Sequence, residues 1–199
     1  IVFIHDGKIV VNPLKPGYIH DVLDELPFPA WGKLPFNKYE MIASPHGVIA
    51  KPNLRYAPIM TSRGCPYHCS YCHISMDKAD DAFSGNIGAY RVKSVDRVLE
   101  EMRFLKTLQV KKLYFEDDSL LAKKSRVKEI FERVLGMGFE IADVNGVNLI
   151  HFLHRSPQGR LEIDRDYLQL LHAAGFDQIV FPVESASQRV LDKYATGKL

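Results

Sequence analysis

The residues best suited to chemistry lie in one short stretch, because all three cysteines of the chain fall within eight positions: Cys65, Cys69 and Cys72. An odd number of cysteines at this close spacing is not typical of a disulfide framework. Clustered thiols favour a reducing, cytoplasmic compartment. Three thiolates on one loop, with Gly64 and Pro66 beside them, indicate a metal centre more than a set of incidental buried cysteines.

Two kinds of metal centre fit this loop. Zinc would take Cys65, Cys69, Cys72 and His73 as a Cys₃His set, but structural zinc sites usually take their ligands as two separated pairs. A 4Fe–4S cluster normally takes four cysteine thiolates. Three thiolates leave one iron open, and an open iron can bind a substrate or cofactor. We therefore favour the cluster and keep zinc as the alternative.

Polar residues also stand directly after each of four predicted strands. Parallel α/β folds carry their chemistry beyond the carboxyl ends of their strands, so these residues are expected around one site. For Asp118 and Ser185 the alternative is that each caps the helix that follows it. Besides the cysteine loop, which follows the first strand, the residues are Glu116, Asp117, Asp118, Asn145, Asn148, Glu184 and Ser185.

The elements that would position these residues alternate between strand and helix. Short apolar or alternating runs predict four strands, at 57–62, 110–116, 139–144 and 176–183. Amphipathic helices follow them, and Ser94 and Asp164 are predicted to cap two of these helices. The alternation predicts an α/β fold with parallel strands, either an open doubly wound sheet or a partial (β/α) barrel. No Gly-rich phosphate loop follows the first strand, which argues against dinucleotide binding.

Length and composition exclude several classes of protein. The chain has 199 residues, 46% of them hydrophobic and 25% charged, which is the balance of a globular domain. A net charge of +2 gives no reason to expect nucleic acid or an anionic membrane as a partner. The longest run without Asp, Glu, Lys or Arg, 64–76, is too short for a membrane span, which needs about 20 residues.

The first fifty residues differ from the rest. Residues 1–11 predict a small hairpin with Asp6 and Gly7 at its turn, and prolines and aromatic residues then alternate up to residue 39. We expect residues 1–50 to be a hairpin and an ordered linker, and residues 51–199 to be part of a barrel. Four strand–helix units cannot close a barrel, and the last strand would leave a bare edge. The sequence is thus expected to be a piece of a longer protein, and poorly soluble by itself.

The cysteine loop carries a resemblance to a known family. Residues 61–72, which read Thr-Ser-Arg-Gly-Cys-Pro-Tyr-His-Cys-Ser-Tyr-Cys, resemble the C-x-x-x-C-x-aromatic-C motif of the radical S-adenosylmethionine (SAM) superfamily. The resemblance extends over residues 57–199. It implies a partial barrel of six (β/α) units, of which four are visible in this sequence.

The resemblance implies a role for each residue of the loop and for the acidic strand end. Cys65, Cys69 and Cys72 would bind three irons of a 4Fe–4S cluster, and the fourth iron would chelate the amino and carboxylate groups of SAM. Residues 115–119 are similar to the family's F-x-D-D segment, in which an acidic residue receives the methionine amino group. Here that residue would be Asp117 or Asp118, which strand alternation places on opposite faces.

Two further contacts to SAM are implied. Tyr71 would lie near the adenine. Glu184 and Ser185 resemble the family's G-x-E-S segment, which contacts the ribose, although Pro182 stands where that segment has glycine.

The linker carries a narrower resemblance. Residues 19–31 are similar to the I-x-D-L-D-x-L-P-x-P strap that joins the cobalamin (B12) domain to the barrel in cobalamin-binding radical SAM proteins. The cobalamin domain, with its D-x-H-x-x-G motif, is absent from these residues. The resemblance implies that cobalamin is bound by a domain outside this chain.

These observations predict a radical SAM enzyme, which uses its cluster to cleave SAM and form a 5′-deoxyadenosyl radical or to support cobalamin-dependent methyl transfer. A methyltransferase acting on unactivated carbon and an oxidative cyclase both fit, each with a small-molecule substrate and an electron donor such as flavodoxin or ferredoxin. A methylthiotransferase of tRNA or a ribosomal protein ranks second. That class carries an additional N-terminal domain with three cysteines, and no cysteine precedes Cys65 in this sequence. A non-catalytic zinc-binding module is the third candidate.

Overall fold

The computed structural model describes residues 2–13, 18–40, 54–79 and 85–197, and its centre is a four-stranded parallel sheet. The strand order is β10-β7-β6-β3, formed by Phe176–Gln178 (β10), Glu140–Asp143 (β7), Lys112–Phe115 (β6) and Tyr56–Ile59 (β3). Ile59 pairs with Phe115, and Phe115 with Asp143, so three carboxyl ends stand side by side. This confirms the predicted α/β fold with parallel strands.

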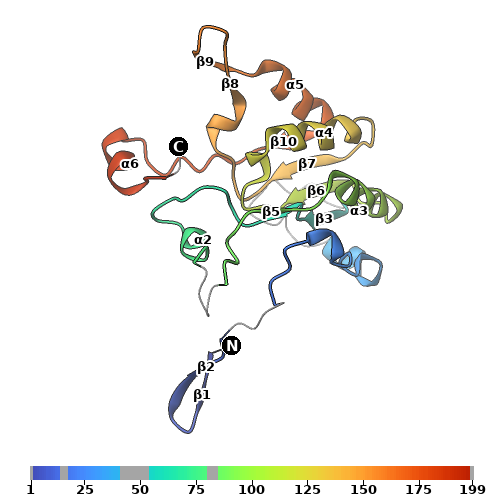
Figure 1. The fold of residues 1–199 in the computed structure, drawn as a ribbon. Coiled ribbons are helices and arrows are strands. Elements are labelled where there is room, and N and C mark those ends of the chain that lie inside the picture. Colours follow the sequence, from blue (N-terminus) through green and yellow to red (C-terminus); the bar gives the residue numbers. More distant parts are fainter. Residues whose placement is uncertain (1, 14–17, 41–53, 80–84, 198–199) are drawn as a thin grey trace.

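Helices Val95–Thr107 (α3), Lys124–Val134 (α4) and Arg165–Ala174 (α5) pack together and cover one face of the sheet (Figure 1). The strands contribute alternate side chains to this layer, as period-two geometry requires. The shared core includes Ala57, Ile59, Leu113, Phe115 and Ile141 from the strands, with Val98, Leu99, Met102, Val127, Ile130, Phe131 and Leu171 from the helices.

Local sequence signals set the ends of two of these helices. Ser94 Oγ accepts a hydrogen bond from the Arg97 backbone N–H at 3.1 Å, and Asp164 Oδ1 accepts one from Tyr167 N–H at 3.0 Å. Both residues are therefore N-caps, as predicted. Gly175 ends α5 with φ +109°, and a Cβ there would lie 2.0 Å from the Phe139 carbonyl oxygen.

The first and last strands are shorter than the sequence predicts. β3 ends at Ile59, and the chain re-enters extended structure as Ser62–Arg63 (β4), which pairs antiparallel with Arg91–Val92 (β5). β10 ends at Gln178 after an irregularity in its register with β7. The predicted strand to residue 183 is therefore wrong beyond Gln178, where the chain leaves the ladder.

Several short elements were not predicted. A hairpin of Leu153–Arg155 (β8) and Leu161–Ile163 (β9) lies between β7 and α5, preceded by the 3₁₀ helix Leu149–Phe152 (η5). Two short helices, His73–Met76 (α2) and Leu120–Ala122 (η4), were also not predicted, whereas Gln188–Tyr194 (α6) is the helix predicted after the fourth strand. In the part of the chain that the structure describes, no helix combines the length and apolarity that crossing a membrane requires.

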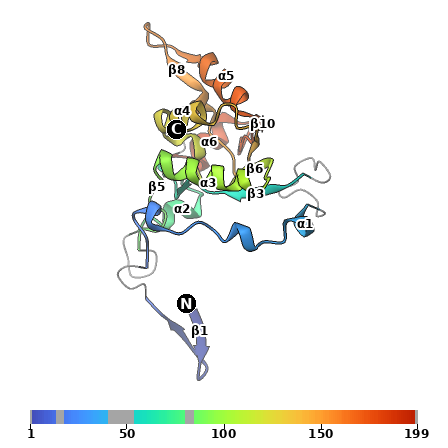
Figure 2. The same ribbon diagram turned by 90° about the vertical axis from the view of Figure 1, so that its right-hand side faces the viewer.

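The predicted N-terminal hairpin is present. Val2–His5 (β1) pairs antiparallel with Lys8–Val11 (β2), and the turn between them has Asp6 at φ +50° and Gly7 at φ +70°. Two positive φ angles are what a two-residue turn of this kind requires. Both views show the hairpin apart from the sheet (Figures 1 and 2).

The linker after the hairpin packs on the body of the fold. It contains Leu23–Glu25 (η1), Trp31–Lys33 (η2) and Phe36–Tyr39 (α1), and it runs beside β3 and α3 (Figure 2). Leu23, Trp31 and Phe36 are buried in it. We refer to residues 19–33 as the strap. The boundary predicted at residue 50 lies outside the described residues.

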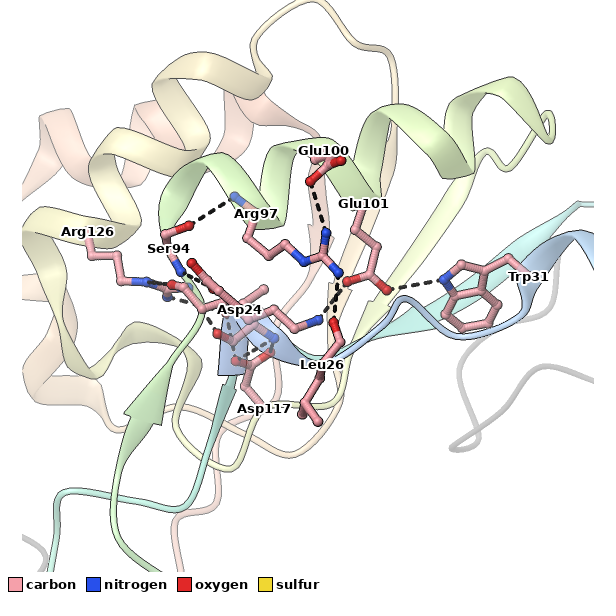
Figure 3. A network of polar contacts seen from close by, with 11 residues as sticks. Asp24, Leu26, Trp31, Ser94, Arg97, Glu100, Glu101, Asp117 and Arg126 are labelled. Atoms are coloured by element: carbon pink, nitrogen blue, oxygen red, sulfur yellow. Dashed lines mark hydrogen bonds and ion pairs between the residues drawn. The ribbon is translucent and has the colours of Figure 1, made fainter. Parts of the chain in front are cut away.

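Polar contacts fix the strap to α3 (Figure 3). Trp31 Nε1 donates to Glu101 Oε1 at 3.1 Å, and Glu101 Oε2 accepts from Lys93 Nζ at 2.6 Å. Glu101 is buried, and both its oxygens have partners. Removing either partner would leave a buried carboxylate oxygen without a donor.

A second set of contacts holds the start of the strap at the N-terminus of α3 (Figure 3). Asp24 Oδ1 accepts from the Ser94 backbone N–H at 2.8 Å, where an acidic side chain also meets the positive end of the helix. Arg97 donates to the Leu26 carbonyl at 2.7 Å, and its guanidinium lies 3.6 Å from the centre of the Phe28 ring.

Candidate functional site

The cysteine loop starts directly after β4, at a glycine that no other residue can replace without strain. Gly64 has φ +71°, and a Cβ there would lie 2.3 Å from the Ala89 carbonyl oxygen. The backbone N–H of Cys65 donates to the Gly88 carbonyl at 3.2 Å. The loop is therefore held against the segment that precedes β5.

The three thiols are half-buried and none is in a disulfide. The Cys72 N–H donates to the Cys69 carbonyl at 3.1 Å, which closes a turn before α2. Within the described residues, no group of three or more His, Cys, Asp or Glu side chains is arranged to hold a single ion. The thiols that the sequence assigns to a metal centre lie partly exposed on this one loop.

The structure separates the two aspartates that follow β6. Asp117 is fully buried, and it accepts hydrogen bonds from Thr61 N–H at 3.1 Å, Thr61 Oγ1 at 2.8 Å and Ser62 Oγ at 2.5 Å. Burial raises the pKa of Asp117, while these donors and the nearby Arg126 guanidinium oppose the rise. Arg126 is itself buried and donates to the Thr61 carbonyl at 3.0 Å. Asp117 thus ties the end of β6 to residues 61–62, and Thr61 in turn binds Arg126 of α4.

Asp118 lies on the opposite side, at the start of the cysteine loop. Its Oδ2 accepts the Gly64 backbone N–H at 2.9 Å, and its side chain is half-buried. Asp118 and Gly64 line a cavity of about 380 Å³ together with His73, Arg91 and the strap-side residue His20. Of the two aspartates, Asp118 is the one that faces an open space beside the cysteines.

The chain after β10 reaches the cysteine loop through Glu184. Burial raises the pKa of Tyr71, and so do its side-chain hydrogen bond to Glu184 and the charge of that carboxylate. Glu184 has φ +64°, an uncommon backbone conformation for a glutamate. Ser185 makes a local turn instead, since its Oγ accepts from Ser187 N–H at 3.1 Å.

Pro182 stands where the family's G-x-E-S segment has glycine, and in this structure it packs against Gly146. A Cβ on Gly146 would lie 2.7 Å from Pro182 Cδ, so the proline ring fits only against a glycine. Nearby, Asn145 Nδ2 donates to the Glu116 carbonyl at 2.8 Å, and Asn148 Oδ1 accepts from Ile150 N–H at 3.1 Å. Asn145 therefore links the ends of β7 and β6, and Asn148 caps η5.

One contact of the loop was missed at the sequence level. Tyr67, between the first two cysteines, has its hydroxyl 2.7 Å from His151 Nε2. Burial, and then the charge of Lys124, lower the pKa of His151 to about 4, so its ring is neutral at pH 7. The two residues are 84 positions apart, and no spacing pattern links them.

An apolar cavity of about 710 Å³ lies at the same end of the sheet, between η5, the chain after β10 and α6. Its walls include Leu149, Leu153, Phe181, Val183 and Leu191. Phe181 and Val183 are 44% and 59% exposed, so this part of the site is open to solvent.

Comparison with known proteins gives a consistent result. The model of the radical SAM superfamily matches residues 59–198. An uncharacterised methyltransferase of Pyrococcus horikoshii is 29% identical over 193 residues, which are 96% of this chain and 35% of that protein. Cytidylyl-2-hydroxyethylphosphonate methyltransferase of Streptomyces wedmorensis is 29% identical over 173 residues, 85% of this chain and 28% of that protein. The chain thus spans about a third of the length of these curated relatives.

Two solved structures share the fold. Both are of the radical SAM methyltransferase TsrM from Kitasatospora setae, at 18% identity over 76% of this chain. The one with cobalamin and a [4Fe–4S] cluster has a TM-score of 0.51 and is covered to 28%, and the one with tryptophan and a SAM analogue has 0.50 and 27%.

Proposed function

The chain belongs to the radical SAM superfamily, and we propose that it carries the cluster- and SAM-binding part of a cobalamin-dependent methyltransferase. The observation that carries the proposal is the cysteine loop. It places Cys65, Cys69 and Cys72 on one partly exposed loop beyond the carboxyl end of β3. In the proposal these three residues bind a 4Fe–4S cluster, which when bound supplies the low-potential electron needed to cleave SAM.

The other residues of the site would bind and orient SAM. Asp118 is proposed to accept the methionine ammonium, because it is half-buried beside the loop, whereas Asp117 is enclosed by Thr61 and Ser62. Glu184 and Ser185 are proposed to contact the ribose. Tyr71 is proposed to lie against the adenine.

Methyl transfer is favoured over oxidative cyclisation and over methylthio transfer. Both curated relatives are named methyltransferases, and one of the two TsrM structures contains cobalamin. The strap resembles that of cobalamin-binding members, so residues 1–50 are proposed to join a cobalamin domain to the barrel part at 51–199. The substrate is proposed to be a small molecule, with a flavodoxin or ferredoxin as the electron donor.

The cluster assignment is tested by substituting Cys69 with alanine in the full-length protein. After anaerobic reconstitution, the wild-type protein is expected to bind iron and sulfide and to cleave SAM, and Cys69→Ala to do neither. Met76→Ala is a matched control, because Met76 lies on α2 just after the loop with 76% of its surface exposed. Iron binding and SAM cleavage retained in Cys69→Ala, or zinc bound in place of iron, would show that the proposal is wrong.

The ammonium contact is tested with Asp118→Asn. A charge-assisted hydrogen bond contributes about 1.5–3 kcal/mol, so the variant is expected to bind SAM about 10- to 100-fold more weakly while its cluster content stays unchanged. Direct binding of SAM to the reconstituted protein gives the measurement. If Asp118→Asn binds SAM as tightly as the wild type, the role of Asp118 is only to accept the hydrogen bond from the Gly64 N–H.

A further inference from the structure

The end of α6 lies directly on the middle of the cysteine loop. The Ser70 backbone N–H donates to the Thr196 carbonyl at 2.9 Å, and Ser70 Oγ donates to the Tyr194 carbonyl at 3.0 Å. The His68 N–H donates to the Gly197 carbonyl at 3.3 Å. The polar groups of residues 68 and 70, on both sides of Cys69, are thus paired with residues 194–197, which we name the latch.

The closest approach is at Gly197. Its φ is +83°, and a Cβ built on it would lie 2.1 Å from the His68 carbonyl oxygen and 3.3 Å from the Cys69 nitrogen. Cys69 Sγ is 3.9 Å from the Gly197 carbonyl oxygen, which is within the range of a weak sulfur hydrogen bond. Only a glycine allows the two backbones to approach so closely.

The segment that ends in the latch contacts the loop at its other end as well. It begins near Glu184, whose carboxylate binds the Tyr71 hydroxyl. Residues 184–197 therefore contact the cysteine loop at two places. Glu184, at one end, contacts Tyr71, and the latch, at the other end, contacts residues 68–70.

We propose that the latch is a positioning element that holds Cys69 in place relative to Cys65 and Cys72 before the cluster binds. Most of the loop between the three cysteines lies outside helix and strand, so without the latch its backbone groups would be free to move. A cluster needs three thiolates at fixed relative positions, and a loop already ordered binds it at a smaller entropic cost. The inference rests on the proposed function of the cysteines as cluster ligands.

The test compares two glycine substitutions in the full-length protein. Gly197→Ala introduces the overlap with His68. Gly159→Ala is the matched control, because Gly159 has nearly the same backbone angle, φ +79°, and nothing lies within 4 Å of a Cβ there. Both variants carry the strain of an alanine at positive φ, but only the first disturbs the latch.

The first measurement uses the protein without its cluster. Alkylation by iodoacetamide is followed by mass spectrometry on the peptides that contain Cys65, Cys69 and Cys72. The overlap with the His68 carbonyl, which Gly159→Ala lacks, must move the latch away from the loop, so alkylation is expected to be about tenfold faster in Gly197→Ala. It is expected to be unchanged in Gly159→Ala, and both variants should have the same melting temperature.

The second measurement uses the reconstituted protein. Loss of iron to a chelator is expected to be about tenfold faster in Gly197→Ala, and the electron paramagnetic resonance spectrum of the reduced cluster should shift. Equal alkylation and iron loss in the two glycine variants, while Cys69→Ala loses the cluster, would overturn the latch and leave the proposed function intact. Cluster binding retained in Cys69→Ala would overturn the proposed function itself.

If Gly197→Ala does not fold, Ser70→Ala replaces it. This variant removes only the hydrogen bond to the Tyr194 carbonyl, so alkylation in the apo-protein is expected to rise about two- to tenfold. An unchanged rate in Ser70→Ala would contradict the proposal.

Discussion

The two halves of the sheet differ in how a buried aspartate at the end of a strand is hydrogen-bonded. In the β3–β6 half, Asp117 accepts hydrogen bonds from Thr61 and Ser62, with a guanidinium nearby. In the β7–β10 half, Asp143 is equally buried, but its Oδ2 accepts only backbone N–H groups. Its Oδ1 has no hydrogen-bond partner within the described part of the chain.

The outer edges of the two halves differ in the same way. The strap covers the β3 side with the buried Trp31 and Leu23, whereas on the β10 side Phe181 and Val183 remain exposed. Within the described residues, the outer edge of the half that carries the cysteine loop is therefore covered by buried side chains, and that of the other half is not. The comparison predicts that a substitution under the strap lowers the stability more than a substitution at the β10 edge.

The largest expected effect is at the strap. Trp31→Ala should destabilise the full-length protein by about 3–5 kcal/mol, since a buried indole is lost and Glu101 loses a donor. Denaturant unfolding gives the measurement. Tyr18→Ala, at a 61% exposed position ahead of the strap, should change stability little and serves as the control. Equal stabilities of the two variants would mean that the strap does not close the β3 side.

The next effect is on the pH dependence of stability and concerns Asp143, in the β7–β10 half of the sheet. Burial raises the pKa of Asp143 to about 7, from an ordinary value of 3.8. The folded state therefore holds a proton that the unfolded state releases near pH 4, and stability falls as the pH rises between about 4 and 7. Asp143→Asn should remove this loss, which is at most about 4 kcal/mol. Unfolding measured at pH 5 and 8 checks it, and an unchanged pH dependence in the variant would refute it.

A smaller effect on stability is expected at Asp117, whose carboxylate accepts several hydrogen bonds. Asp117→Asn replaces an acceptor oxygen by an NH₂ group facing the hydroxyls of Thr61 and Ser62, and should lower stability by about 1–3 kcal/mol. Asp118→Asn, with a half-buried side chain, is the comparison variant and should unfold like the wild type. If both variants unfold alike, burial of Asp117 does not distinguish the two positions.

The smallest effect is expected at the open edge. Phe181→Ser should change the stability by no more than about 0.5 kcal/mol, because the ring is 44% exposed and its one ring contact in the described residues is with Phe152. It should also reduce self-association, measured by light scattering. A loss of several kcal/mol would mean that the β10 side is as closely packed as the β3 side.

The sequence predicted those parts of the fold and site that depend on local pattern. Ser94 and Asp164 cap helices by contacts to the residue three positions ahead, and the cysteines lie on one loop, so short-range spacing was enough. Strand alternation placed Asp117 and Asp118 on opposite faces, but only the packing of Thr61 against Asp117 shows which face is closed.

The features that were missed depend on contacts between distant segments. Tyr67 meets His151 across 84 positions, and the register irregularity that shortens β10 depends on how it pairs with β7. The Pro182 position could not be interpreted from the motif alone, because its partner Gly146 belongs to a different loop. Such pairs carry no periodic signal in one sequence.

The contacts of the strap also connect it to the residues that precede the cysteine loop. Trp31 holds Glu101, Glu101 holds Lys93, and the Lys93 carbonyl accepts from Arg126, which also binds the Thr61 carbonyl three residues before Gly64. Close-packed interiors transmit strain with little compression. A displacement of the strap would therefore disturb a continuous series of contacts that ends at Thr61, at the entry to the cysteine loop.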